Sequence, residues 1–492
     1  MKSIGYQWLI ERFDLKVCDL LTKSYAVPES RMKEVDEGLV RNLYYPLRRV
    51  SVDDTWQENL VFAIKNEGVN LEVLKAFFAT RTNEEMLPFV LEHPTGSFHR
   101  RLWFFYEYLT GRRLDLVDVA MGNYIDAVDE DCQFALPRDV AIRERRYRVM
   151  NNLIGTRDFC PMIRKTAAIK AFPAEKLKHM SDELLNRYPP ELLYRAVQYL
   201  YIKETKSSFA IERETPDQGR MDRFISILKN VSLDPVEKEF LISLQNIIVE
   251  GRYAQKDWRT DQVYVGETLT PDHEKVHFIG VKPEDVAGIM RGFLSVLNAW
   301  ISVPGGDPVV IAAVMSFAFV FIHPFDDGNG RLHRYFMHYI LARMGFTPRE
   351  FIFPVSAVLL KQSAEYDRML EAFSKRLMSR IDYMMDSNGE VKVEGESVDF
   401  YRYIDYTPIV ERFQQVIRIT IETEWKVELD YLVRYDRMRT DMRAIVDMPE
   451  KKANQFILFV RQNDGKLSAA KRKLFLELTD DEIARLETVV NA

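Results

Sequence analysis

The sequence predicts a mainly α-helical protein, and three observations indicate this class. Apolar residues recur at helical spacing along most of the chain, and the central part contains two short runs typical of strands, Val263–Gly266 and Val276–Ile279. Val309–Ile322 is almost entirely apolar but shorter than the roughly 20 residues that cross a bilayer, so it is expected to be a core helix. The composition, 47% hydrophobic and 29% charged, is that of an ordinary soluble globular chain.

A chain of 492 residues is expected to contain about two to four domains. Residues 1–170 alternate helical patterns with short breaks, which predicts a helical N-terminal domain of unassigned role. Its expected helices cover Trp56–Asn66, Leu71–Thr80, Phe98–Thr110 and Val140–Leu153. Long helices dominate residues 180–385, the second predicted domain, and the polar stretch Asp386–Ser397 is the expected linker.

The last predicted domain, residues 398–492, is small, helical and charged. Within it, Phe456–Leu467 is interpreted as the turn and strand of a winged helix. Such a domain would offer a site for DNA. A net charge of −6, however, gives no general attraction to nucleic acid or to an anionic membrane.

The compartment is predicted from the cysteines and the N-terminus. Cys18, Cys132 and Cys160 are scattered without metal or disulfide spacing, which fits a reducing compartment. The N-terminal residues become charged at Glu11 and contain no signal-peptide core. A cytoplasmic protein without a membrane segment is therefore expected.

A short polar loop, His323–Arg334, separates the apolar helix from the next helical pattern. The first amides of a helix have no partners within it, and Gly328 and Gly330 let the backbone approach an anion closely. Arg331 and Arg334 would stand in the first turn, where the helix dipole disfavours a cation by about 0.3–1 kcal/mol. Two arginines at that place indicate a bound anion, so the loop is interpreted as a site for a phosphorylated ligand.

The loop also contains two acids and a histidine. Asp326 and Asp327 would repel an anion unless one of them holds a divalent cation that bridges to phosphate, as Mg²⁺ does. His323, with an ordinary pKa near neutrality, is the natural general base. A plain helix–loop–helix connection with an Asp-Gly turn would explain the glycines but neither the histidine nor the arginines.

These residues resemble the signature of the Fic (Fido) family, His-x-Phe-x-Asp/Glu-Gly-Asn-Gly-Arg-x-x-Arg. All eight fixed positions match, which is far more specific than a lone glycine motif. They are His323, Phe325, Asp327, Gly328, Asn329, Gly330, Arg331 and Arg334. The resemblance covers about residues 200–385 and implies a Fic helical core with protein adenylyltransferase activity. AMP would pass from ATP to a Ser, Thr or Tyr hydroxyl of a target protein or of the chain itself.

The resemblance implies a role for each site residue. His323 would take the proton of the target hydroxyl, and Asp327 would hold Mg²⁺ or Mn²⁺ against the phosphates, with Asp326 solvated. The ATP-binding residues would be Asp327, Gly328, Asn329, Gly330, Arg331, Arg334 and Tyr366.

A hairpin at about residues 259–279 resembles the family's flap, which positions the target side chain. The flap would begin with Arg259–Gly266, and a target peptide would pair with the edge of its strand. The positioning residues would be Val263, Tyr264, Val265 and Gly266.

Ser207–Arg213 resembles the family's inhibitory helix motif, Ser/Thr-x-x-x-Glu-Gly/Asn, in a helix expected at about 190–213. Ser208 and Glu212 are four residues apart and so share one helix face. The resemblance implies that Glu212 pairs with Arg334 in the place of the ATP γ-phosphate. The chain departs from the motif at Arg213, where glycine or asparagine is usual, and a bulky side chain there would alter how the helix packs.

Three other functions stay open at this point. The same fold could transfer UMP, phosphocholine or phosphate, or it could remove AMP with Glu212 positioning the water. A non-enzymatic module that senses nucleotide, or binds DNA through its terminal domains, is the third. The complete signature argues against an inactive enzyme, and Asp327, Arg331 and Arg334 favour a nucleoside triphosphate in the orientation of ATP. The target, a homo-oligomeric state and the role of residues 1–170 are not indicated.

Overall fold

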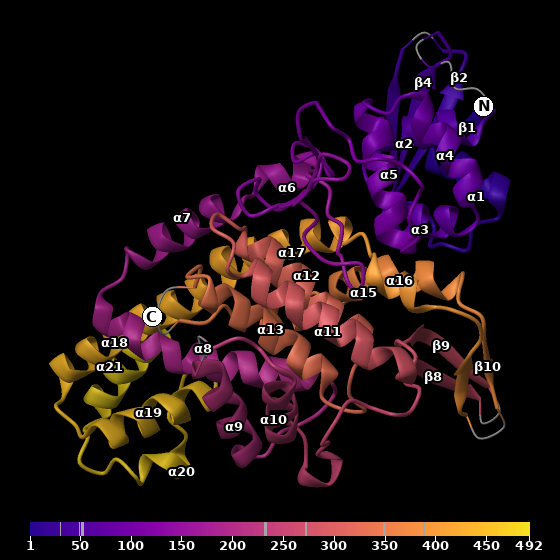
Figure 1. Ribbon diagram of the computed structural model, residues 1–492. Coiled ribbons are helices and arrows are strands. Elements are labelled where there is room, and N and C mark those ends of the chain that lie inside the picture. The colour runs from indigo at the N-terminus through magenta and orange to yellow at the C-terminus, as the bar shows by residue number, and fades with distance from the viewer. Residues whose placement is uncertain are drawn as a thin grey trace.

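The computed structural model describes residues 1–29, 31–48, 50, 54–230, 234–270, 273–347, 351–386 and 389–492. Helices make up most of it, with a few small sheets, which confirms the predicted mainly α class (Figure 1). Among the described residues, no helix combines the length and the apolar composition that a bilayer crossing requires.

The N-terminal region is a mixed α/β unit, so the prediction of a helical domain was wrong. A four-stranded sheet has the order β1-β2-β4-β3, with β2 and β4 parallel and the other pairs antiparallel. Its elements are β1 (Lys2–Ile4), α1 (Tyr6–Phe13), β2 (Thr22–Val27), β3 (Lys33–Glu37), β4 (Val40–Pro46), α2 (Trp56–Asn66), α3 (Leu71–Ala79), α4 (Asn83–Glu92) and α5 (Ser97–Thr110). The strands are short and pair across sequence gaps, so local helical periodicity did not indicate them.

A second small sheet replaces the helix expected at Val140–Leu153. Strand β7 (Val149–Asn151) pairs with β6 (Ile142–Glu144) antiparallel and with β5 (Ile125–Asp126) parallel. Arg148 lies in the turn before β7 with a φ of 51°, in the left-handed region, and this conformation cannot continue a helix.

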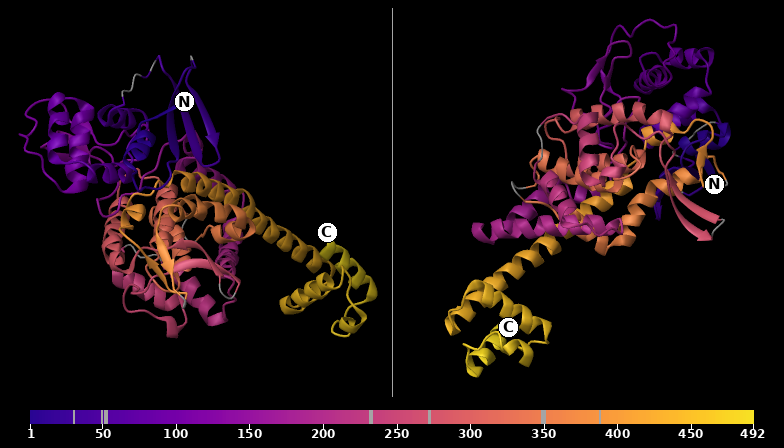
Figure 2. Two further views of the ribbon diagram at one scale, coloured as in Figure 1. Left: turned by 90° about the vertical axis from the view of Figure 1, so that its right-hand side faces the viewer. Right: turned by 90° about the horizontal axis from the view of Figure 1, so that it is seen from below.

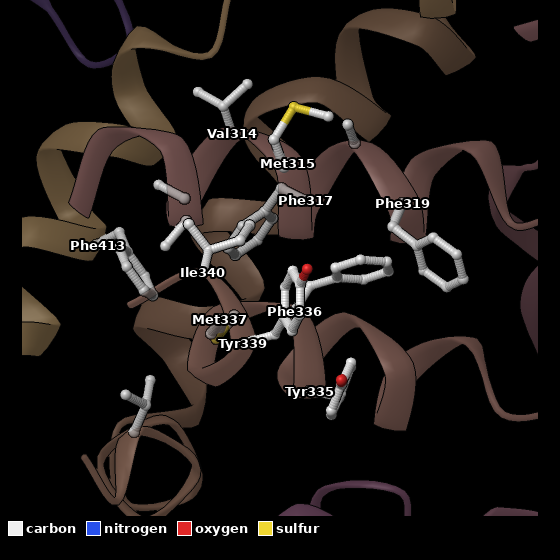
Figure 3. Packing of buried hydrophobic residues seen from close by; sticks show 14 of the residues in the cluster. Val314, Met315, Phe317, Phe319, Tyr335, Phe336, Met337, Tyr339, Ile340 and Phe413 are labelled. Carbon is white, nitrogen blue, oxygen red and sulfur yellow. The ribbon is translucent and has the colours of Figure 1, made fainter. Parts of the chain in front are cut away.

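The core of the molecule surrounds α12 (Pro308–Ile322), which is buried at nearly every position. Asp307 caps its start by accepting hydrogen bonds from the Val309 and Val310 amides at 2.9 and 3.0 Å. Helices α11 (Pro283–Trp300), α13 (Asn329–Arg343) and α17 (Thr407–Ile419) pack against it. Figure 3 shows Phe317 and Phe319 of α12 facing Phe336 and Ile340 of α13, which fixes how the loop between the two helices is presented.

Helices on either side of this core complete the central region (Figure 1). They are α6 (Ala167–Ala171), α7 (Ala174–Leu185), α8 (Pro190–Ile211), α9 (Gln218–Lys229), α10 (Lys238–Ile248), the 3-10 turn η1 (Gly251–Tyr253), α14 (Val355–Lys361) and α15 (Ser363–Met378). The predicted hairpin is present as β8 (Tyr264–Thr270) and β9 (His273–Ile279). Part of the predicted linker is also a hairpin, because β11 (Val391–Val393) pairs with β10 (Tyr383–Met385) and buries both valines.

The C-terminal region is helical throughout, and the winged-helix interpretation was wrong. Residues 398–492 are all described and contain no strand. They form α16 (Val398–Arg402), α17, the π-helical turn η2 (Thr420–Trp425), α18 (Lys426–Ile445), α19 (Glu450–Gln462), α20 (Ala469–Arg472) and α21 (Asp480–Asn491). Phe456, Ile457 and Val460 share one buried face of α19, which is helical rather than strand spacing. Figure 2 shows α18 leading away from the body to α19–α21.

Candidate active site

His323 ends α12 in the left-handed conformation, with φ 56° and ψ 61°. Its amide still donates to Phe319 O at 3.0 Å, so the chain leaves the helix sharply at this residue. Its ring Nδ1 lies 3.1 Å from Val320 O, an acceptor, which assigns the proton to Nδ1 and leaves Nε2 as a base. Burial lowers the pKa of His323 to about 4, so the imidazole is neutral near pH 7.

Hydrogen bonds within the loop after His323 fix its conformation. The Asn329 side chain accepts from the Phe325 amide at 3.1 Å and donates to the Phe325 carbonyl at 2.6 Å. The Phe325 ring is fully buried against Trp258, with ring centroids 5.2 Å apart. Both polar ends of the Asn329 side chain are thus engaged within the loop, and its predicted contact with ATP stays a prediction.

Helix α13 begins directly after Gly328, whose φ of 91° is one that glycine adopts readily. The Gly328 amide donates to Asp327 Oδ1 at 2.6 Å. Within the described part of the chain, the amides of Asn329 and Gly330 have no such acceptor. These two N–H groups are the ones that an anion at the helix N-terminus would meet.

Arg259 joins the loop to the flap, and sequence analysis did not assign it a role. It is 3% exposed, its amide donates to Pro324 O at 3.0 Å and its Nε donates to His323 O at 2.6 Å. Its other nitrogens donate to Asp261 O at 2.6 Å and to Val281 O. One buried guanidinium therefore fixes the histidine backbone and both ends of the hairpin. Its one sequence signal is its position at the start of the predicted flap.

Arg331 lies between two carboxylates. Its Nη2 is 2.7 Å from Asp327 Oδ1, and its guanidinium is 3.4 Å from both carboxylate oxygens of Glu214. The side chain is almost fully buried, and Glu214 also accepts from Arg220 at 2.6 Å. Sequence analysis missed Glu214, which lies outside the matched motif and two residues beyond Glu212.

Arg334 is fully buried and bound to the predicted inhibitory residues. Its Nε donates to Ser208 Oγ at 2.7 Å, and its Nη2 donates to Ser208 O and to Glu212 Oε1, each at 2.8 Å. Burial opposes the charge of the guanidinium, but Glu212 and Tyr366 outweigh it, and the pKa of Arg334 is raised. A Cβ at Gly330 would lie 2.1 Å from Glu212 Oε1, so this pairing requires glycine there.

The backbone at Arg213 shows why glycine or asparagine is usual at this position of the motif. Helix α8 ends with the Glu214 amide donating to Phe209 O and the Arg213 amide donating to Ala210 O, both at 3.0 Å. This is the Schellman pattern, in which the residue after the C-cap takes a left-handed conformation. Arg213 has a φ of 58°. Glycine or asparagine suits that conformation, whereas arginine pays a steric penalty of roughly 1–2 kcal/mol.

Buried contacts hold the rest of α8 against the core. The fully buried Glu204 carboxylate accepts from the Ser356 amide at 2.9 Å, pairs with His338 Nε2 at 2.8 Å and contacts Ser356 Oγ. Tyr366 of α15 lies beside Arg334, and burial raises the pKa of its hydroxyl to about 12; its predicted contact with ATP stays a prediction.

The four residues predicted to position the target, Val263–Gly266, lie at the start of the β8–β9 hairpin, and their role stays a prediction. The Gly280 amide donates to Val263 O at 3.0 Å, and a Cβ at Gly280 would lie 3.2 Å from His323 Cβ, so the hairpin base adjoins the histidine. Tyr264 Oη donates to Glu274 at 2.8 Å, and Val265 is 49% exposed. A Cβ at Gly266 would lie 2.9 Å from Lys275 O, which explains the glycine.

The site thus combines His323, whose lowered pKa keeps it neutral near pH 7, with the N-terminus of α13 and the two buried arginines Arg331 and Arg334. Residues 235–341 match the Fic/DOC family model. The chain therefore carries a Fic/DOC domain, within the range 180–385 expected for it.

Named relatives match about a fifth to a quarter of the chain. "Protein adenylyltransferase Fic" of Drosophila willistoni is 38% identical over 92 residues, which are 19% of this chain and 16% of that protein. The Aedes aegypti protein of the same name is 32% identical over 133 residues, 25% of this chain and 24% of its own length. The chain thus matches less than a quarter of these relatives' length.

A solved structure is similar at lower identity. A Fic family protein from Desulfovibrio desulfuricans G20 is 18% identical, with a TM-score of 0.36, over 64% of this chain and 85% of that one.

Proposed function

We propose that this chain is a protein adenylyltransferase, which transfers AMP from ATP to a Ser, Thr or Tyr hydroxyl of a target protein or of itself. The observation that carries the proposal is the position of His323, which ends α12 with its Cβ beside Gly280 at the hairpin base, six residues before α13 begins at Asn329. The match of residues 235–341 to the Fic/DOC family model and the similarity of the chain to named adenylyltransferases support the same reaction.

In the proposed reaction, the target hydroxyl oxygen bonds to the α-phosphorus of ATP while its proton passes to His323 Nε2. The bond from the α-phosphorus to the bridging oxygen breaks, and pyrophosphate leaves with that electron pair. The amides of Asn329 and Gly330 and the side chains of Arg331 and Arg334 balance the charge on the phosphates. Positioning and charge of this kind supply most of the catalysis in phosphoryl-type transfers.

Asp327 is suited to hold Mg²⁺ or Mn²⁺. Its Oδ1 is engaged by Arg331 and the Gly328 amide, but in the described part of the chain its Oδ2 accepts no hydrogen bond, and the side chain is 44% exposed. No cluster of three His, Cys, Asp or Glu side chains among the described residues could hold a cation. One carboxylate with phosphate oxygens and water is the ligand set that Mg²⁺ prefers. When bound, the cation would supply positive charge to the phosphates.

The chain is proposed to be autoinhibited by Glu212. The 2.8 Å contact from its carboxylate to Arg334 uses the guanidinium that the γ-phosphate would need. ATP could then bind only in an unproductive position, or after Glu212 has left. The Ser208 contacts with Arg334 hold the last turns of α8 in register for this pairing.

Glu214 is proposed to act in the same way on Arg331. Both signature arginines would then have a carboxylate from the end of α8 in place of phosphate. At 3.4 Å the Glu214 contacts are longer than the 2.8 Å contact of Glu212, and Glu214 is shared with Arg220. Its contribution to inhibition should therefore be the smaller of the two.

The test is transfer of label from ATP to protein in the presence of Mg²⁺. The wild-type chain, Glu212→Gly and Glu212→Gly/His323→Ala are incubated with α-labelled ATP, with γ-labelled ATP and with α-labelled UTP. We expect label on protein from α-labelled ATP, most with Glu212→Gly and none with the double variant. Label from γ-labelled ATP alone would instead mean phosphate transfer, and label from UTP alone would mean uridylyl transfer.

A further inference from the structure

A second groove lies between helices α8, α18 and α19, outside the signature. Its volume is about 610 Å³, within the usual range for small-molecule pockets. Each helix contributes residues at helical spacing: Arg195 and Tyr199 from α8, Tyr431, Tyr435, Arg439 and Arg443 from α18, and Glu450 and Asn454 from α19. The groove is thus formed by one face of each helix.

Arg439 is the feature that indicates a ligand. It lines the groove and is only 8% exposed. Among the described residues, no carboxylate lies within ion-pair distance of its guanidinium, and no hydrogen bond to it is formed. Its neighbour Arg195, by contrast, is paired with both oxygens of Asp436 at 2.7 and 2.8 Å. The Arg439 side chain is buried, but its guanidinium nitrogens are open to the groove, so an anion there would meet an unpaired positive charge.

The tyrosines indicate the kind of anion. Tyr431 and Tyr435 have ring centroids 6.3 Å apart, and Tyr435 Oη donates to Asn454 at 2.6 Å, which fixes its ring. Tyr199 is 51% exposed on the opposite helix of the groove. Aromatic faces stack well on planar bases, and a nearby arginine adds attraction for phosphate. A simple inorganic anion would leave these rings unused.

We propose that this groove binds a phosphorylated nucleoside, with the phosphates on Arg439 and Arg443 and the base against the tyrosines. Glu450 would accept hydrogen bonds from the sugar hydroxyls or the base amine. Binding here is independent of the catalytic site and does not require the proposed function to be correct.

The binding test is calorimetric titration of ADP, pyrophosphate and adenosine into the intact chain. We expect two classes of ADP site in the wild type. Arg439→Gln should weaken one class at least tenfold, and Arg331→Ala, which removes a charge that balances the phosphates in the proposed reaction, should weaken the other. The matched control is Arg437→Gln, on the same helix but with an 85% exposed side chain, and it should change neither class.

Tyr199→Ala serves as the second variant, because an exposed side chain can be removed without unfolding the chain. It should weaken ADP binding at the Arg439-dependent site several-fold and leave pyrophosphate binding unchanged. The proposal is overturned if Arg439→Gln and Tyr199→Ala both retain wild-type ADP binding. Equal affinity for ADP and pyrophosphate at this site would overturn its nucleoside part.

Discussion

The signature loop, residues 323–334, and the end of α8, residues 208–214, face each other but are held in different ways. The loop is fixed by hydrogen bonds between its own backbone, at His323 and Phe325, and the side chains of Arg259 and Asn329. The end of α8 is held by side-chain contacts to Arg331 and Arg334 and contains a left-handed arginine, Arg213. The difference indicates that the loop is preorganised for chemistry, whereas the end of α8 is the part able to move.

The largest effect should come from His323→Ala, which we expect to abolish transfer of label and leave ATP affinity nearly unchanged. The histidine acts on the target hydroxyl and not on the nucleotide. His179→Ala, an exposed histidine of α7, is the control and should retain full activity. Labelling by His323→Ala at the wild-type rate would show that another group is the base.

The same residue predicts a pH profile. The base must be neutral, and burial lowers its pKa to about 4. The neutral form thus predominates above that pKa. Titration of His323 should therefore not change the labelling rate of Glu212→Gly between roughly pH 6 and 8. The rate should fall only as the pH drops through the pKa of His323 in the folded chain. A labelling rate that halves near pH 6.5 would instead mean that His323 titrates at the ordinary pKa of a histidine.

Next in size, Glu212→Gly should raise labelling about tenfold to a hundredfold, since a charge-assisted bond contributes roughly 1.5–3 kcal/mol. Glu183→Gly, on an exposed part of α7, is a matched loss of charge and should have no effect. Equal activity of Glu212→Gly and wild type at saturating Mg-ATP would end the proposal of autoinhibition.

Arg259→Gln tests whether the loop depends on its anchor. We expect kcat to fall by about tenfold, because losing charge-assisted bonds to the His323 and Val281 carbonyls displaces the base, while ATP affinity stays within twofold. The control is Arg252→Gln, at an exposed arginine seven residues earlier, and it should change neither kcat nor ATP affinity. A parallel loss of ATP affinity would mean that the whole site, and not the histidine alone, had shifted.

Glu214→Gln should raise labelling only a few-fold, because its contacts with Arg331 are long and shared with Arg220. Combined with Glu212→Gly, it should add further activity if the two carboxylates block different phosphates. Glu237→Gln, at the start of α10, is the control. If the double variant is no more active than Glu212→Gly, then only the contact of Glu212 with Arg334 is inhibitory.

The smallest effect is expected from Arg213→Gly, which removes the steric cost of a left-handed arginine and should stabilise the end of α8 by about 1 kcal/mol. Basal labelling should fall a few-fold, and the melting temperature should rise slightly. Asp464→Gly, a left-handed residue in the C-terminal helices, should stabilise the chain without altering labelling. Higher labelling with Arg213→Gly would contradict this account.

The sequence was most informative where chemistry and local structure coincide. The loop between α12 and α13 has a fixed spacing of glycines, acids and arginines, so its elements and the pairing of Glu212 with Arg334 followed from motifs. Arg259 could not be found in this way, because its guanidinium binds His323 O, which is 64 residues away in the sequence. Glu214 was missed for the same reason, since only the folded chain brings it to Arg331.

The wrong predictions concern strands. The N-terminal sheet pairs β2 with β4 in parallel, a contact that no local pattern specifies. At Phe456–Val460, a short apolar run was taken for a strand although its buried residues have helical spacing. Short apolar runs do not by themselves distinguish the two structures.

Glu204 limits how Glu212 can be released. Its buried carboxylate is bound to His338 and Ser356, eight residues before Glu212 on the same helix, so α8 cannot slide or swing away as a rigid rod without breaking that buried network. Opening would instead be a fraying of the final turns, from Thr205 to Glu212. The rate of activation would then follow the exchange of amide hydrogens in those turns with solvent, while the amides before Glu204 stay protected.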